Sequence, residues 1–171
     1  PLKLRTASNS TRVHAEYVAE MARQLIFAQY GNEAYTRGLN VYTTLNAGEQ
    51  EAAYKALREG IMSYERRQKY RGPEKFINLP SNAQEREDAI DDVLANHPDN
   101  SDVIAAVVLD ASPRKIVAAR ADGEHFDITG EGLRPAESGL SPKAPPNTKI
   151  RPGAVIRAIK TAKGSWEITQ L

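Results

Sequence analysis

The chain has 171 residues, a formal net charge of +1 and 26% charged residues. Such a balanced surface gives no general attraction to nucleic acid or to anionic lipid. The absence of cysteine excludes disulfide scaffolds, thiolate zinc sites and cysteine nucleophiles. Hydrophobic residues make up 40% of the chain but aromatic residues only 6%, so we expect a modest core of alanine, valine, isoleucine and leucine.

The apolar runs and the two ends of the sequence bear on its context. The longest apolar run, residues 103–109, is far short of a membrane span, and no secretory signal is visible. The chain starts at Pro1 without an initiator methionine and stops at Leu171 inside an expected strand. We therefore expect both ends to be cuts in a longer polypeptide.

The N-terminal part is predicted to hold an arm and a helix. Residues 1–10 are polar and unpatterned, which predicts an extended arm. A helix is expected over about 11–30, because apolar residues recur there at three- and four-residue spacing. Ser10 or Thr11 would cap its start, and Gly31 would end it.

A strand followed directly by a helix is the clearest local pattern. Residues 39–45 are rich in β-branched and aromatic side chains, which favours a strand. Asn46 is a good helix cap, and an amphipathic helix is expected over about 47–70, stopped by Gly72 and Pro73. Small residues on its apolar face would let a neighbour approach closely.

A linker and a short helix are expected next. Residues 74–81 have the composition of a linker, and an acidic helix is predicted over about 84–96, ended by His97 and Pro98. The acidic run favours an exposed helix face, because it lacks the glycine turn and ligand spacing of a calcium loop. We assign the whole of residues 1–100 to a linker.

From residue 101 onward the hydrophobic period becomes that of strands. A connection over 130–152, with room for one short helical turn, separates the first three expected strands from the last two. The five strands are expected at 103–109, 115–121, 125–129, 154–159 and 166–171. The continuous apolar run of the first predicts a strand buried on both faces, and Asp122 and Gly123 predict a hairpin turn between the second and the third. This arrangement is typical of a five-stranded Greek-key barrel of the OB type. The predicted fold class is α+β, with an OB-like domain over 101–171.

Few residues offer metal or cofactor chemistry. The histidines, His14, His97 and His125, lie in three separate segments without partners at metal-ligand spacing. No phosphate-binding loop, dinucleotide fingerprint or G-x-S-x-G motif is present. We therefore expect no metal-binding residue, no cofactor-binding residue and no cofactor.

One motif could indicate a nucleophile. Ser112 to Lys115 fits S-x-x-K, the motif of penicillin-recognising serine enzymes, and Lys160 begins a stretch close to their K-T-G. In those enzymes the serine opens a helix, so that the lysine amine reaches the hydroxyl one turn later. Here Pro113 stands between two expected strands, which favours a hairpin, and the middle S-x-N motif is missing. We therefore expect no catalytic residue.

The expected barrel offers few groups that could bind a nucleic acid. OB-type barrels that bind single strands use aromatic platforms in a basic groove. The expected strands offer only Phe126 and Trp166 with few cations, so we do not expect nucleic-acid binding. An OB-type nucleic-acid or glycan-binding module nevertheless stays open as the alternative function. For a protein partner, the sequence offers loop 130–152 and the edge of the barrel.

Several stretches together resemble one known family. They are AEYVAEM at 15–21, GLNVYTTL at 38–45, QEAA at 50–53, YRGP at 70–73, RPGAVI at 151–156 and WEITQL at 166–171. This series resembles the interdomain segment and the inserted OB-like domain of class A penicillin-binding proteins of the 1A type. The resemblance covers nearly the whole chain and is more specific before residue 73 than after it.

The resemblance implies a longer, bifunctional peptidoglycan synthase with glycosyltransferase and DD-transpeptidase domains. It would act on the periplasmic face of the inner membrane, anchored by an N-terminal helix outside this chain. The present chain lacks the motifs of both catalytic domains, so its implied role is a non-catalytic linker and docking or spacer domain. Without those domains we expect residues 15–70 to be under-packed.

The resemblance also implies partners. They are an outer-membrane lipoprotein activator, other cell-wall synthesis proteins, the parent's own catalytic domains and peptidoglycan. No residue of this chain can be matched to any of these contacts from the sequence. A regulator that binds the parent's catalytic domains remains a further alternative.

Overall fold

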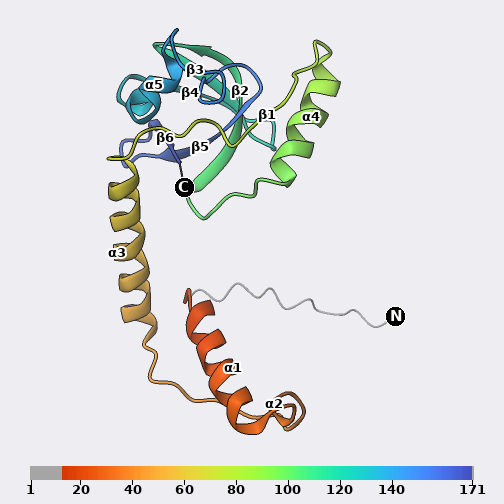
Figure 1. The fold of residues 1–171 in the computed structure, drawn as a ribbon, viewed down its shortest axis with the longest axis vertical. Coiled ribbons are helices and arrows are strands. Elements are labelled where there is room, and N and C mark those ends of the chain that lie inside the picture. The colour runs from red at the N-terminus through yellow and green to blue at the C-terminus, as the bar shows by residue number, and fades with distance from the viewer. Residues whose placement is uncertain (1–12, 171) are drawn as a thin grey trace. The chain divides into compact units, whose positions relative to one another are not determined.

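The computed structural model describes residues 13–170 and divides into two compact units, Pro1–Gly60 and Ile61–Leu171. Figure 1 labels the helices and strands of both units. The longest helix, α3 (Ala47–Glu65), carries the chain from the first unit into the second. None of the helices within the described residues is long and apolar enough to cross a membrane.

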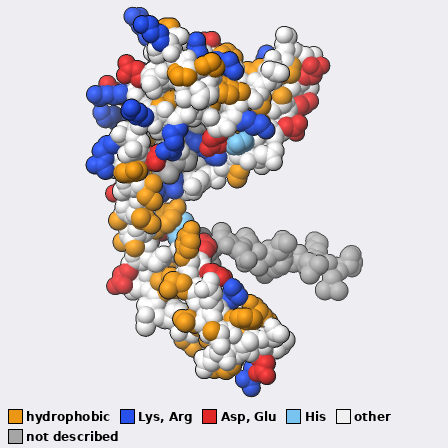
Figure 2. Space-filling model, in the orientation of Figure 1, with side chains coloured by type: hydrophobic (Ala, Val, Ile, Leu, Met, Phe, Trp, Pro, Cys, Tyr) orange, Lys and Arg blue, Asp and Glu red, His pale blue; other side chains and the backbone are white. Residues whose placement is uncertain are grey.

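The first unit is built from short helices with little core. Helix α1 (Glu16–Tyr30) ends at Gly31, which has a φ of 56° and donates its amide to the Phe27 carbonyl. Helix α2 (Glu33–Thr36) follows at once. None of the unit's described residues is buried, and Figure 2 shows hydrophobic side chains on the surface there. The predicted arm and the predicted caps of the first helix lie outside the described residues.

The segment between α2 and α3 departs from the sequence prediction. Residues 39–45 form no strand, because a strand needs a partner and none lies within the described part of this unit. Local β-propensity alone does not pair a backbone. The cap of the next helix is confirmed, since the Asn46 Oδ1 accepts from the amides of Gly48 (2.9 Å) and Glu49 (3.3 Å).

Helix α3 stops at Glu65, about five residues before its predicted end. After the helix, two backbone hydrogen bonds span three residues instead of four. The Arg67 amide donates to the Tyr64 carbonyl, and the Gln68 amide donates to the Glu65 carbonyl. Arg66, just beyond the helix, forms an ion pair with Glu167 at 2.7 Å. Contacts within the second unit therefore replace the last predicted turn.

The second unit is an antiparallel, six-stranded OB-like sheet that is not closed into a barrel (Figure 1). The strand order is β1-β5-β2-β3-β4. Strand β6 also pairs with β5, further along the same edge that the short β1 pairs with. The strands are β1 (Lys75–Phe76), β2 (Val103–Ser112), β3 (Lys115–Ala119), β4 (His125–Thr129), β5 (Ala154–Lys160) and β6 (Trp166–Thr169). The five predicted strands are confirmed, and β1 was missed.

Between β4 and β6, within the described residues, no ladder of hydrogen bonds forms. The rings of Phe126 on β4 and Trp166 on β6 meet there instead, with centroids 4.4 Å apart. Side-chain packing thus spans the gap that backbone pairing would close in a complete barrel.

Strand β1 joins the predicted linker to the sheet. Glu74 donates its amide to Val155 at 2.9 Å, and the amide of Ile77 donates to the Gly153 carbonyl at 2.8 Å. Gly153 has a φ of 86°, and a Cβ there would overlap the Ile77 carbonyl oxygen. Residues 74–77 are therefore part of the sheet and not a linker. The second unit begins at Ile61, whereas the sequence prediction began the OB-like domain at 101.

Both faces of the sheet are covered. Helix α4 (Ala83–Ala95) buries Ile90, Val93 and Leu94 against one face. The other face is covered by the connection after β4, which contains the 3₁₀ helix η1 (Gly130–Ala136) and helix α5 (Glu137–Leu140). This explains why the first six residues of β2 are all buried, as their continuous apolar run predicted.

The connection over 130–152 is more ordered than the sequence suggested. Leu133, Ala136, Leu140 and Ile150 are all buried in the main core beneath the sheet. The expected short helical turn is confirmed as α5, and the 3₁₀ helix η1 before it was missed. Gly132 and Pro135 lie within η1 and Gly139 lies within α5, so this part of the connection forms a folded cap on the sheet.

Candidate functional site

The S-x-x-K sequence forms a hairpin. Ser112 ends β2 and pairs directly with Lys115, the first residue of β3. The Ser112 Oγ donates to the Lys115 carbonyl at 3.0 Å and accepts from the Lys115 amide at 3.1 Å. The Lys115 Nζ lies 2.6 Å from the Asp127 Oδ2. The predicted hairpin is confirmed, and the lysine amine is engaged by a carboxylate on the neighbouring strand.

The stretch close to K-T-G also lies in a hairpin. The Lys160 Nζ sits 5.7 Å from the centre of the Trp166 ring, a cation–π arrangement. Thr161 and Ser165 share a hydroxyl hydrogen bond of 2.8 Å across the turn. Because Trp166 contacts both Lys160 and Phe126, its ring packs within the protein instead of forming an open stacking platform.

The three histidines have different surroundings. His14 stacks on Tyr54 in the first unit, with ring centroids 3.6 Å apart. The His97 Nδ1 lies 2.6 Å from Glu74, and His125 stands at the start of β4. Across residues 13–170, no cluster of three or more histidine, aspartate or glutamate side chains could hold a metal ion.

Glu74 is the centre of an ion-pair network that joins β1, β5 and the end of α4. Its carboxylate accepts from Arg157 at 2.7 and 3.1 Å, and Arg157 also donates to the Pro98 carbonyl at 2.7 Å. Burial alone would raise the pKa of Glu74, but the hydrogen bonds from Arg157 and His97 outweigh it and hold the pKa below its ordinary value. This network ties the predicted linker to the sheet.

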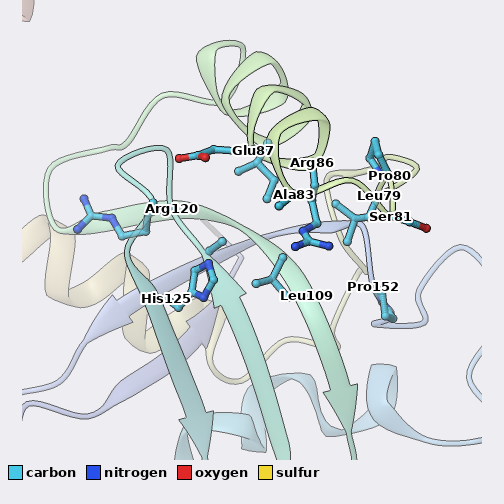
Figure 3. Close-up of a pocket in the computed structure, with 13 residues that line it drawn as sticks. Leu79, Pro80, Ser81, Ala83, Arg86, Glu87, Leu109, Arg120, His125 and Pro152 are labelled. Atoms are coloured by element: carbon cyan, nitrogen blue, oxygen red, sulfur yellow. The ribbon is translucent and has the colours of Figure 1, made fainter.

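A groove lies in the second unit between α4 and the sheet, and we call it the α4 groove. It has a volume of about 570 Å³. Its walls come from α4, from the end of β2, from the β3–β4 turn and from the turn before β5 (Figure 3). The lining residues are Leu79, Pro80, Ser81, Ala83, Arg86, Glu87, Ile90, Leu109, Ala119, Arg120, Gly123, His125 and Pro152.

The two arginines that line the α4 groove differ in their ion pairs. Arg120 is surrounded by three carboxylates, those of Asp99, Asp122 and Glu124, at 3.1 to 3.6 Å. Arg86, by contrast, makes no ion pair with any residue of 13–170. Figure 3 shows its guanidinium reaching from α4 toward the sheet. The groove therefore offers an unpaired guanidinium above an apolar floor, which suits a peptide segment that carries a carboxylate.

The comparisons with known proteins agree with this fold. Residues 70–171 match the family described as penicillin-binding protein OB-like domain. The chain belongs to the penicillin-binding proteins that carry this domain. The predicted resemblance is confirmed, and the matched range starts close to β1 and not at residue 101.

Relatives in this family are much longer than the chain. Penicillin-binding protein 1A of Neisseria cinerea is 34% identical over 157 residues, which cover 91% of this chain and 19% of the relative. Penicillin-binding protein 1A of Escherichia coli is 33% identical over 120 residues, which cover 70% of this chain and 14% of the relative. The crystal structure of penicillin-binding protein 1A from Haemophilus influenzae matches with a TM-score of 0.70 and 29% identity, covering 91% of this chain and 22% of that one.

Sequence reasoning missed the α4 groove. It named loop 130–152 and the barrel edge as partner surfaces, and these stay predictions, although Leu133, Ala136, Leu140 and Ile150 of the loop belong to the core. The groove depends on how α4 crosses the sheet, which periodicity does not reveal. One signal was present: Arg86 is the sole basic residue in the sequence AQEREDAIDDVLA of α4.

Proposed function

We propose that the chain is the non-catalytic connector and OB-like docking domain of a bifunctional peptidoglycan synthase. The intact protein would polymerise and cross-link peptidoglycan at the periplasmic face of the inner membrane. The partner proposed for the OB-like domain is an outer-membrane lipoprotein activator. The parent's own catalytic domains, other cell-wall proteins and peptidoglycan are the other partners that the resemblance implies.

The observation that carries the docking role is the α4 groove. Arginine is enriched among residues that dominate binding energy, because its planar guanidinium makes paired hydrogen bonds and stacks on apolar surface. Arg86 is half-buried and unpaired among the described residues, with Ile90 and Leu109 nearby in the same groove. A partner carboxylate would pair with Arg86 while neighbouring apolar side chains cover the floor.

The non-catalytic role rests on the hairpin at Ser112. A serine nucleophile needs a free base within hydrogen-bond reach. The Ser112 hydroxyl is bonded to the backbone of Lys115, while the Lys115 amine lies beside Asp127. Both groups therefore stabilise the β2–β3–β4 meander.

A binding titration tests the docking role. The purified chain would be titrated with the purified lipoprotein activator of the same organism, by calorimetry. We expect Arg86→Glu to weaken binding at least about ten-fold, which corresponds to about 1.4 kcal/mol. The matched control is Lys163→Glu, a charge reversal in the exposed β5–β6 turn, which should change the affinity less than about two-fold.

Three results would count against the proposal. Equal losses for Arg86→Glu and Lys163→Glu would show a general charge effect in place of a groove contact. No binding of the activator by the unaltered chain would remove the proposed partner. Salt-dependent binding of single-stranded DNA, or retention on peptidoglycan strands without any binding of the activator, would favour the nucleic-acid or glycan-binding module instead.

A further inference from the structure

Residues 39–45 follow an extended course beside α1, although they pair with no strand. Every second residue of the segment lines a groove whose other wall is formed by α1 and α2: Leu39, Val41, Thr43 and Leu45. Between them, Tyr42 is 91% exposed. An alternation of period two is the signature of an extended chain, in which successive side chains point to opposite faces.

One face of this extended segment therefore lines a groove and the other faces solvent, although Leu39, Val41 and Leu45 on the groove side are still 37–49% exposed. The groove is apolar, with Val18, Ala22 and Ile26 of α1 opposite the segment, and has a volume of about 440 Å³. The exposed face presents Tyr42 and Thr44, which are side chains typical of cross-strand pairs in sheets. The segment thus has the two-faced pattern of a sheet strand packed on a helix.

The backbone of the segment lacks the bonds that a strand needs. Within residues 13–170, the one hydrogen bond made by a backbone group of 39–45 runs from the Leu45 amide to the Thr43 hydroxyl, at 3.4 Å. An unpaired strand is a ready template for a second strand. Backbone pairing supplies the affinity in such β-strand addition, and alternate side chains supply the register.

We propose that residues 39–45 are an edge strand completed by a strand from another domain of the same longer polypeptide. This rests on the proposed function in one respect, that the chain is part of a longer synthase. The related proteins support this occupant, because 78% of the Haemophilus influenzae chain lies outside the matched region. A strand in the same polypeptide acts at an effective concentration of about millimolar, which a second copy reaches only at high protein concentration.

Hydrogen exchange tests the pairing directly. Exchange of the amides of 40–45 would be followed by mass spectrometry in this chain and in the longer polypeptide that contains it. We expect near-complete exposure in the chain alone and protection at least about 100-fold greater in the longer polypeptide. Labelling of the same preparation with a fluorescent β-lactam shows whether it is a folded transpeptidase, so that a failure of the pairing is distinguished from a failure of the proposed function.

Proline variants identify the paired edge. Adjacent amides of a strand point to opposite edges, so either Tyr42→Pro or Thr43→Pro should remove a pairing donor. Tyr42→Val and Thr43→Val are the controls, because valine keeps the amide and the β-propensity. We expect one proline variant to lose the protection in the longer polypeptide and both valine variants to keep it.

Each other outcome overturns the inference. Amides of 40–45 that exchange freely in a β-lactam-reactive longer polypeptide would show that no strand pairs there. Protection that appears in the isolated chain and rises with its concentration would assign the edge to a second copy. Protection unchanged by both proline variants would place the protecting contact elsewhere than on the strand backbone.

Discussion

Replacing Gly153 by alanine tests whether β1 is a true part of the OB-like unit. Gly153 has a φ of 86°, a backbone conformation that alanine adopts at a cost of about 1–2 kcal/mol. Its Cβ would also overlap the Ile77 carbonyl oxygen, so β1 would have to move away from β5. That movement would break the Ile77–Gly153 hydrogen bond and strain the packing around it, at about 1–3 kcal/mol for each effect.

We therefore expect Gly153→Ala to lower the free energy of unfolding by roughly 3–8 kcal/mol. For a unit of this size that corresponds to a fall in the melting temperature of roughly 12–32 °C. The assay is thermal unfolding followed by circular dichroism. A loss of this size is a large part of the stability of a typical domain.

Gly164→Ala is the matched control. Gly164 has a similar φ of 81°, but no atom lies within 4 Å of the position that a Cβ would take. It should therefore show the backbone cost of about 1–2 kcal/mol without the overlap. Equal losses for the two variants would refute the reasoning, because β1 would then not be held against Gly153, and residues 74–81 would behave as the linker that the sequence indicated.

Two further perturbations probe the cap and the ion-pair network. Leu133→Ala should cost about 2–5 kcal/mol in denaturant unfolding, because the connection over 130–152 is core and not a free loop; a loss under about 0.5 kcal/mol would contradict this. Glu74→Gln should destabilise the unit near neutral pH, because the ionised carboxylate is held by Arg157 and His97. The folded-state pKa of Glu74 is lowered, so the difference from the unaltered chain should shrink as the pH falls below 4.5. A difference that grows with acid would contradict the assignment.

The parts of the fold that the sequence predicted are those set by local chemistry. The continuous apolar run within β2 predicted a strand buried on both faces, and that is its environment. Asp122 and Gly123 predicted the β3–β4 turn, where Gly123 has a φ of 74°. The position of an asparagine at 46 predicted the N-terminal cap of α3, and the Asn46 side chain forms that cap. Each of these signals depends on residues only a few positions apart.

The parts that were missed depend on distant contacts. Strand β1 has two residues and exists because β5, almost eighty positions later, offers an edge to pair with. Arg157 and Glu74 form their ion pair across 83 positions. Residues 39–45 illustrate the reverse case, since the local β-propensity is present but no partner strand lies within the described residues of their unit.

The same distinction applies to the candidate site. The hairpin at Ser112 could be predicted, because Pro113 and the flanking apolar runs specify it locally. The α4 groove could not, because its walls come from α4, the end of β2, the β3–β4 turn and Pro152. The position of Arg86 in an otherwise acidic helix was visible in the sequence, but its place above Leu109 and His125 follows only from the packing of α4 on the sheet (Figure 3).

Covalent labelling with a fluorescent β-lactam tests most directly the claim that this chain is the non-catalytic part of a penicillin-binding protein. The purified chain and a longer polypeptide that includes a transpeptidase domain would be labelled side by side and compared after denaturing electrophoresis. We expect the longer polypeptide to carry the label and this chain to carry none, because the Ser112 hydroxyl is bonded to Lys115 within the hairpin. Stoichiometric label on this chain that Ser112→Ala abolishes would contradict the non-catalytic assignment.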